Sequence, residues 1–173
     1  MAATYINKVD NASVYIDGNS FLGRAKSVKC PEFEFEMSEH KNLGLVGTLK
    51  LPSGVTAQEG EIVWDGYYPE VAAIASNPFQ NRQIMIRANT AVYNAAGRVT
   101  EVPLVIVMNC TFKKSPLGEY KPQENAEYTT EFSVTSIKQS IDGKEVLFFD
   151  AFTNVFRVAG DDVLTKYRSN IGS

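Results

Sequence analysis

The chain has 173 residues, 44% of them hydrophobic, and a formal net charge of −3 at pH 7. This length suits one soluble domain with a sizeable core, and the charge excludes the broadly basic surface of a nucleic-acid-binding protein. The two cysteines, Cys30 and Cys110, are too few for a disulfide framework. Both lie in apolar-patterned stretches, which predicts small buried side chains.

The N-terminal residues 1–11 are polar and lack the apolar core of a secretory signal, and we expect them to form a flexible arm. Residues 13–17 alternate between apolar and polar side chains, which predicts a strand, and Asp17-Gly18-Asn19 predicts the turn after it. The longest wholly apolar run, residues 102–108, is far shorter than a membrane span. We therefore expect a soluble protein inside the cell until assembly.

Residues 28–37 carry the most regular alternation in the chain, which predicts a strand with two different faces. Residues 38–47 are first polar and then glycine-rich, alternation resumes over residues 48–51, and Pro52 is expected to end it. The sequence therefore predicts an extended hairpin arm over residues 30–52. One face of its first strand carries Phe33, Phe35 and Met37, and the other carries Glu32, Glu34 and Glu36.

The predicted turn of this arm is apolar, although an exposed turn is expected to be polar. Leu43, Leu45 and Val46 are the apolar residues, and Gly44 and Gly47 make the segment flexible. We predict that these five residues form contacts between subunits.

The middle of the chain predicts a short strand over residues 61–64 and a short helix over residues 69–75, with Pro69 at its first position. A hairpin follows over residues 83–93 and 98–112, and its apolar stretch 104–108 is expected to lie centrally in a sheet. Residues 115–125 contain two prolines and a glycine and predict a loop.

Residues 126–149 predict another long hairpin, with Asp142-Gly143 at its turn. Tyr128, Phe132 and Val134 keep one apolar phase, which slips by one residue before Ile137. A one-residue slip reverses the two faces of a strand, so we expect a bulge near Thr135 and Ser136.

The C-terminal part predicts a further short strand within residues 150–158 and a helix over residues 161–171. We expect the apolar side of this helix, formed by Val163, Leu164 and Tyr167, to dock on the barrel. Together, residues 1–173 predict one mainly β domain, an antiparallel β-barrel or sandwich with long hairpin arms and two short α-helices.

Residues suited to catalysis or metal binding are few. His40 is the only histidine, and it lies in a polar stretch without further ligands at metal-site spacing. Glu32, Glu34 and Glu36 form either a solvated face, a functional acidic surface or a catalytic carboxylate pair. Trp64, Tyr67 and Tyr68 form either a platform for a sugar or base, or the cap of a barrel end. The residues predict neither an enzyme nor a metal or cofactor site.

Several short motifs occur in a distinctive order. They are Val14-Tyr15-Ile16-Asp17-Gly18, Cys30-Pro31 before the arm, Ile141-Asp142-Gly143-Lys144-Glu145, and the final Tyr167-Arg168-Ser169-Asn170-Ile171-Gly172-Ser173. In content and order they resemble the major tail tube proteins of contractile-tailed bacteriophages, a family that includes the tubes of R-type pyocins. The resemblance covers nearly the whole chain, although residues 52–60 do not match the family clearly.

The resemblance implies a β-barrel subunit that forms hexameric rings, which stack into a hollow conduit for DNA in the virion tail, after assembly in the host bacterial cytoplasm. It also implies the fold of the type VI secretion tube, and as partners the sheath, tape-measure, baseplate and tail terminator proteins, without catalysis, cofactor or membrane. An acidic lumen repels phosphate, so Glu32, Glu34 and Glu36 are candidates for its lining.

Two other functions are compatible with the same pattern. A small-molecule-binding β-barrel would enclose its ligand in the barrel interior. A carbohydrate-binding β-sandwich would use Trp64, Tyr67 and Tyr68 as its platform.

Overall fold

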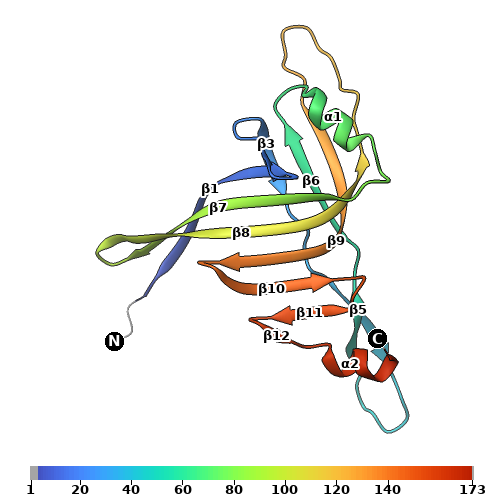
Figure 1. The fold of residues 1–173 in the computed structure, drawn as a ribbon. Coiled ribbons are helices and arrows are strands. Elements are labelled where there is room, and N and C mark those ends of the chain that lie inside the picture. Colours follow the sequence, from blue (N-terminus) through green and yellow to red (C-terminus); the bar gives the residue numbers. More distant parts are fainter. Residues whose placement is uncertain (1–3, 173) are drawn as a thin grey trace.

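The computed structural model describes residues 4–172 (Figure 1). Twelve strands and two helices follow one another along the chain. Their bounds are β1 Ile6–Ile16, β2 Asn19–Ser20, β3 Ala25–Lys29, β4 Phe35–His40, β5 Leu49–Val55, β6 Gln58–Trp64, α1 Pro69–Ala75, β7 Arg82–Asn94, β8 Gly97–Lys114, β9 Tyr128–Ile141, β10 Lys144–Asp150, β11 Val155–Val158, β12 Asp161–Asp162 and α2 Thr165–Ile171.

One large antiparallel sheet contains ten of the strands, and the predicted mainly β fold is confirmed. Its main path runs in the order β12-β11-β10-β9-β8-β7-β1-β2, and β6 with β3 branches from β9. Strands β4 and β5 form a separate two-stranded sheet. Figure 1 shows this pair projecting from one end of the molecule beside α2, whereas α1 lies at the opposite end.

The branch in the sheet lies at Thr135 of β9. On one side β9 pairs with β8, but on the other it pairs with β6 up to Val134 and with β10 from Ser136 onwards. The pairing with β8 shifts register at this point, since Asn109 pairs with Ser136 and Cys110 with Val134. The predicted bulge is therefore confirmed, and it is the place where the sheet divides into two layers.

The core lies between the branch formed by β3 and β6 and the sheet formed by β1, β7, β8 and β9. The indole of Trp64 is only 1% exposed and donates a hydrogen bond to the Thr130 hydroxyl at 3.0 Å. Helix α1, whose bounds are as predicted, buries Val71 and Ala75 on this core. The largest side chains buried there are Trp64, Phe112, Phe132, Ile16, Ile62, Ile84 and Met108.

Strand β1 begins earlier than the sequence predicts. Residues 6–11, expected to belong to a flexible arm, pair with the outer end of β7, from Ile6 opposite Tyr93 to Asn11 opposite Asn89. Their side chains are exposed, so backbone hydrogen bonds to β7 and not apolar burial define this part of the strand. Residues 1–3 of the predicted arm lie outside the described residues.

The structure contains a hairpin arm. Its first strand, β4, is shorter than expected, and its second strand, β5, is longer. Residues 30–34 form no strand, because Pro31 lacks a backbone donor and the chain crosses there from one sheet to the other. Pro52 does not end β5, since a register shift between Glu36 and Met37 accommodates it in this two-stranded sheet. We call residues 35–55 the arm and residues 41–48 the arm tip.

The C-terminal helix also differs from the prediction. Asp161 and Asp162 pair with β11 as the short strand β12, and α2 begins only at Thr165. The helix has no buried residue, and Leu164 is half-buried. Val163 and Tyr167 are more than half exposed, so the expectation that Val163, Leu164 and Tyr167 dock on the barrel is wrong for the single chain.

Candidate assembly interface

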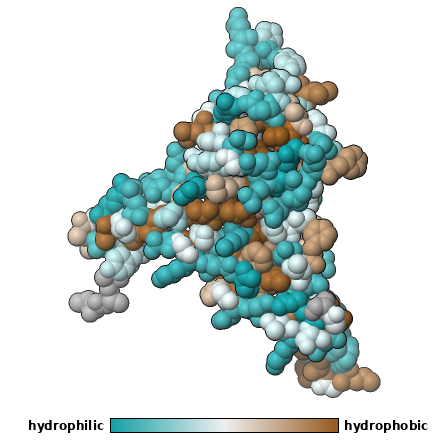
Figure 2. All heavy atoms as spheres, viewed as in Figure 1, coloured by the Kyte–Doolittle hydropathy of each residue, from teal (hydrophilic) through white to brown (hydrophobic). Residues whose placement is uncertain are grey.

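The arm tip is apolar and exposed, as the sequence predicts. Relative to a free residue, Leu43 is 105% exposed and Val46 is 109% exposed, while Leu45 is 48% exposed. Gly44 adopts a φ of 89°, a conformation that other residues rarely reach. Figure 2 shows hydrophobic residues gathered at this end of the molecule. Because the apolar side chains at its centre are exposed, the tip is suited to contact with another protein surface.

The two strands of the arm expose apolar side chains on both faces. Phe35 and Val55 are paired and share one face with Met37 and Pro52, whereas Leu49 and Leu51 pair with His40 and Ser38 and lie on the other. Phe35, Met37, Leu49 and Leu51 are each 45–50% exposed. An isolated hairpin is marginal in water, so this arm requires cover from outside itself.

A cluster of phenylalanines attaches the base of the arm to the body. Phe33 packs edge-on against Phe149 with ring centroids 5.6 Å apart, and it stacks on Phe156 at 6.0 Å. Phe35 reaches the same Phe156 ring at 6.0 Å. Each such aromatic pair contributes about 0.5–1.5 kcal/mol beyond its buried area, which fixes the direction in which the arm leaves the body.

Beyond this cluster, an open apolar groove of about 570 Å³ separates the arm from the C-terminal segment. It is lined from the arm by Phe35, Pro52, Ser53, Gly54 and Val55, and from the body by Phe149, Ala151, Asn154, Phe156, Val163, Leu164 and Tyr167. Sequence patterns alone did not indicate this groove, because its two walls are more than 90 residues apart in the chain.

Polar contacts hold the wall formed by the C-terminal segment in place. The Arg168 guanidinium donates to the backbone oxygen of Asn154 at 2.9 Å and to the carboxylate of Asp162 at 2.5 Å. The hydrogen bond from Arg168 lowers the pKa of Asp162 below its ordinary value. Asp162 also accepts a hydrogen bond from the backbone of Leu164 at 3.0 Å. These contacts fix the position of the C-terminal segment, so the groove has two ordered walls.

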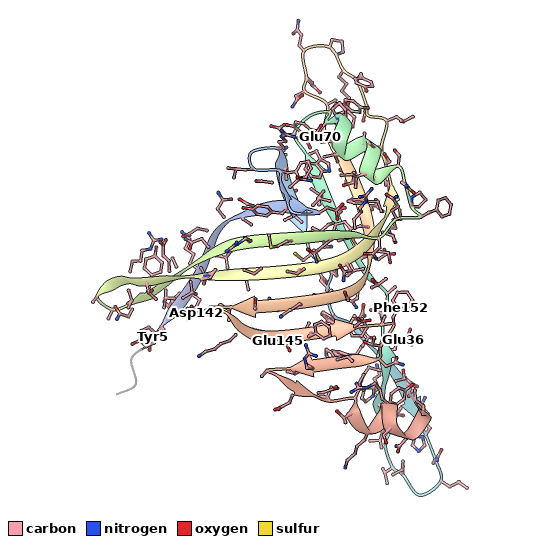
Figure 3. All side chains as sticks on the ribbon, in the orientation of Figure 1. Tyr5, Glu36, Glu70, Asp142, Glu145 and Phe152 are labelled. Carbon is pink, nitrogen blue, oxygen red and sulfur yellow. The ribbon has the colours of Figure 1, made fainter. Side chains whose placement is uncertain are left out.

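The three glutamates lie along the base of the arm, and all of them are exposed. Lys29 Nζ lies 3.9 Å from the carboxylate of Glu32. Figure 3 shows Glu36 on the arm, close to where the arm joins the body. Their exposure is compatible with a channel lining and with an ordinary solvated face alike.

The aromatic group at the opposite end is not an open platform. Trp64 is buried, and the space between it, Tyr68 and Tyr128 measures only about 20 Å³. Ligand pockets measure about 300–1,000 Å³. This arrangement supports the barrel-cap interpretation and leaves no room for a ligand beside Trp64.

The remaining candidate groups show no sign of chemistry. His40 is exposed at the end of β4. Burial raises the pKa of the Cys110 thiol to about 12 and raises the pKa of Cys30, so neither is a reactive thiolate at neutral pH. Within residues 4–172 no three His, Cys, Asp or Glu side chains gather as a metal site. Neither helix there has the length and apolarity to cross a membrane.

Comparison with known structures supports the fold. Two chains of an extracellular contractile injection system, PVC, in its extended state are similar: one from the sheath–tube complex, with a TM-score of 0.55, and one from the sheath/tube terminator structure, with a TM-score of 0.53. Each comparison covers 75% of this chain, with 87% and 92% of the other chain respectively, at 13% identity. A chain of the anti-feeding prophage cap has a TM-score of 0.51 at 18% identity, with 75% and 87% covered.

Comparison by sequence identifies the family. The tail tube protein of Escherichia phage P2 is 24% identical over 166 residues, which cover 95% of this chain and 96% of that protein. The family described as phage tail tube protein FII matches residues 6–172. The exposed apolar arm suits a structural subunit that polymerises. The chain belongs to the phage tail tube protein FII family and is a non-enzymatic structural component of the virion tail.

Proposed function

We propose that this tail tube subunit forms hexameric rings that stack into a hollow conduit for DNA, with the arm tip as a contact between rings. The observation that carries this proposal is the exposure of Leu43, Leu45 and Val46 at the end of a projecting hairpin. Burying one such side chain contributes about 1.5–3 kcal/mol. The gain recurs at every subunit of a ring, so weak single contacts give a stable polymer.

The proposed partners follow from the position of a tube within a tail. The similar PVC structures include a sheath–tube complex and a sheath/tube terminator, and another similar structure is a tube-terminating cap. By analogy, the sheath surrounds this tube and terminator and baseplate proteins bind its two ends. A tape-measure protein occupies the channel before DNA passes through it.

We further propose that Glu32, Glu34 and Glu36 line the channel. Their carboxylates are exposed, whereas Phe33 between them packs on the body. A negatively charged wall repels the phosphates of DNA, so that DNA slides without sticking.

The assembly proposal is tested by changing Leu43, Leu45 and Val46 together to serine. Circular dichroism is expected to show an unchanged fold, and electron microscopy is expected to show no tubes. A matched control changes the exposed Leu22, Leu117 and Val99 to serine and is expected to leave tubes intact. Normal tubes from the tip variant would show that the tip is no assembly element.

The lining proposal is tested by changing Glu32, Glu34 and Glu36 to lysine. Rings are expected to form, and phage that carry this subunit are expected to eject DNA more slowly, because lysines attract phosphate. A density map of the tube that places these three side chains on the outer wall would refute the proposal.

A further inference from the structure

The exposed apolar surface of the described chain is concentrated on the arm and on residues 163–171. Of the 22 large apolar side chains that are exposed, ten belong to these two segments. Taking roughly 150 Å² for one large side chain, their exposed fractions amount to an apolar surface on the order of 900 Å². The ten residues are Phe35, Met37, Leu43, Leu45, Val46, Leu49, Leu51, Val163, Tyr167 and Ile171.

The size of this apolar area indicates a surface that binds another protein. The largest apolar patch of a typical monomer is about 300–600 Å², whereas one partner in a stable protein–protein interface contributes about 800 Å². Because Leu49 and Leu51 lie on the opposite face of the arm from Phe35 and Met37, this area is spread over more than one face, and its total is of the size that one partner contributes to an interface. A second copy of the chain is the occupant that a homopolymer supplies at every position.

The surface has two complementary parts. The arm tip is a projection whose Leu43 and Val46 side chains are fully exposed. The groove between the arm and the C-terminal segment is a recess of about 570 Å³ with mostly apolar walls. A projection and a recess of the same character on one chain allow each copy to give one contact and receive another.

The tip cannot fill the groove of its own chain. The arm lines the groove only with Phe35 and residues 52–55, which lie at its base. The tip lies at the other end of β4, and the six residues of this strand span roughly 20 Å at about 3.3 Å per residue. Figure 1 shows the tip pointing away from the body, beyond α2. Contact between tip and groove is thus possible only between two copies.

Accepting the proposed tube, we infer that the arm tip of each subunit inserts into the groove between the arm and residues 163–171 of a second copy. Leu43, Leu45 and Val46 of one copy then cover Phe35, Val163 and Tyr167 of the next. Projection and recess occupy different places on the chain, so the contact is head-to-tail and propagates from copy to copy. The same contact covers one apolar face of the arm, whose isolated hairpin is marginal in water.

Cross-linking tests this inference. With Cys30→Ser as background, Val46→Cys is combined with Val163→Cys, and the assembled protein is treated with a short bifunctional thiol cross-linker. A head-to-tail contact is expected to give a ladder of trimers and larger species on a denaturing gel. The matched control pairs Val46→Cys with Val99→Cys, since Val99 and Val163 are similarly exposed, at 52% and 56%, and it is expected to stay monomeric on the gel, because no thiol then lies in the groove.

A second pair of variants keeps the inference testable if the cysteine variants assemble poorly. Leu45→Glu is expected to abolish tubes, and adding Val163→Lys is expected to restore them at least tenfold over the Leu45→Glu variant, because the two new charges meet in the groove. Adding Val99→Lys instead is expected to restore nothing.

The outcomes separate this inference from the proposed function. Tubes of the cysteine variant without a ladder, or restoration by Val99→Lys equal to that by Val163→Lys, would refute the docking of tip in groove and leave the tube intact. Failure of the unmodified protein to form rings or tubes would count against the proposed function, whereas a ladder from the Val46→Cys, Val163→Cys variant would still support tip-to-groove docking in open chains.

Discussion

The first half of β9 and the first strand of the arm carry the same alternating pattern, yet only one of them is buried. In β9, Tyr128, Phe132 and Val134 are 0–6% exposed, whereas Phe35 and Met37 in β4 are 45% and 50% exposed. Alternation specifies that a strand has an apolar face, but it does not specify what covers that face. In β9 the cover comes from the same chain, and in the arm we propose that it comes from another copy.

The difference lies in the number of neighbouring strands. The first half of β9 is paired on both sides, with β6 and β8, and Phe112 packs edge-on against Phe132 at 6.0 Å. Strands β4 and β5 have only each other. A folded monomer with an unsatisfied arm is a subunit whose polymerisation completes its packing.

The largest predicted effect compares one phenylalanine from each region. Phe132→Ala is expected to lower the free energy of unfolding of the monomer by about 3–5 kcal/mol, because the ring is fully buried. Phe35→Ala is expected to cost about 1 kcal/mol or less. Urea unfolding at low protein concentration measures both, and equal losses would contradict the contrast between barrel and arm.

Substitutions at two glycines, one in the core and one in the arm, test the same contrast between the tightly packed barrel and the exposed arm. A Cβ added at Gly60 would lie 2.5 Å from the Phe132 ring and 2.7 Å from the backbone oxygen of Lys29. Gly60→Ala is therefore expected to destabilise the monomer by about 1–3 kcal/mol. At Gly54, in the arm, an added Cβ meets nothing within 4 Å. If Gly54→Ala lowered the melting temperature as much as Gly60→Ala, the arm would be more tightly packed than described.

A smaller effect is expected from the buried indole. Trp64→Phe removes the donor to the Thr130 hydroxyl and is expected to cost about 1 kcal/mol from the lost hydrogen bond. Tyr67→Phe is the control, since Tyr67 is 58% exposed, and it is expected to change stability by less than about 0.5 kcal/mol. Thermal unfolding of both variants decides whether Trp64 is part of the core or of an open platform.

The smallest predicted effect is a change in how the stability of the folded chain depends on pH. Hydrogen bonds from Arg157, at 2.8 and 3.0 Å, lower the pKa of Glu145. A lowered pKa in the folded state gives stability that is present above the unfolded pKa of about 4.3 and is lost as pH falls through the folded pKa. The melting temperature of Glu145→Gln is therefore expected to lie below that of the unchanged protein at pH 7 and to approach it toward pH 3.

The control for this titration is Glu36→Gln, because Glu36 lies exposed on the arm. Figure 3 shows the two glutamates on different elements, Glu145 on β10 and Glu36 at the arm. The Glu36→Gln variant keeps the ion pair between Glu145 and Arg157 and is expected to show the pH dependence that this pair gives the unchanged protein. A Glu145→Gln difference that does not narrow in acid would show that its ion pair with Arg157 contributes nothing measurable.

Local patterns predicted much of the fold. Helix α1, the hairpin of β7 and β8, the hairpin of β9 and β10 and the bulge at Thr135 all follow from residues close together in sequence. Prediction failed where distant residues decide. Residues 6–11 are polar and become a strand only because β7 offers them a partner, and Asp161 and Asp162 are held by β11 instead of opening the helix.

In the candidate interface, too, features set by local residues could be predicted and features set by distant residues could not. The exposure of Leu43, Leu45 and Val46 could be predicted because an apolar turn is a local anomaly. The groove could not, since Phe35 and Tyr167 approach one another only after β10 and β11 have folded between them. The Phe33, Phe35 and Met37 face was predicted as one unit, but only Phe33 and Phe35 join the aromatic cluster of the body.

The bulge at Thr135 also bears on which changes in gene length this chain tolerates. Deleting the codon for Thr135 would make Val134 and Ser136 consecutive opposite the consecutive Cys110 and Asn109, so β9 would keep both faces but lose the bulge at the branch of the sheet. Deleting a paired residue such as Ser133 would instead shift the register by one and turn part of the apolar face of β9 away from the core. Insertions in residues 41–48, by contrast, lengthen a loop at small entropic cost. Lineages of this family that share this branch point are thus expected to vary in length at the arm tip and to keep β9 constant in length.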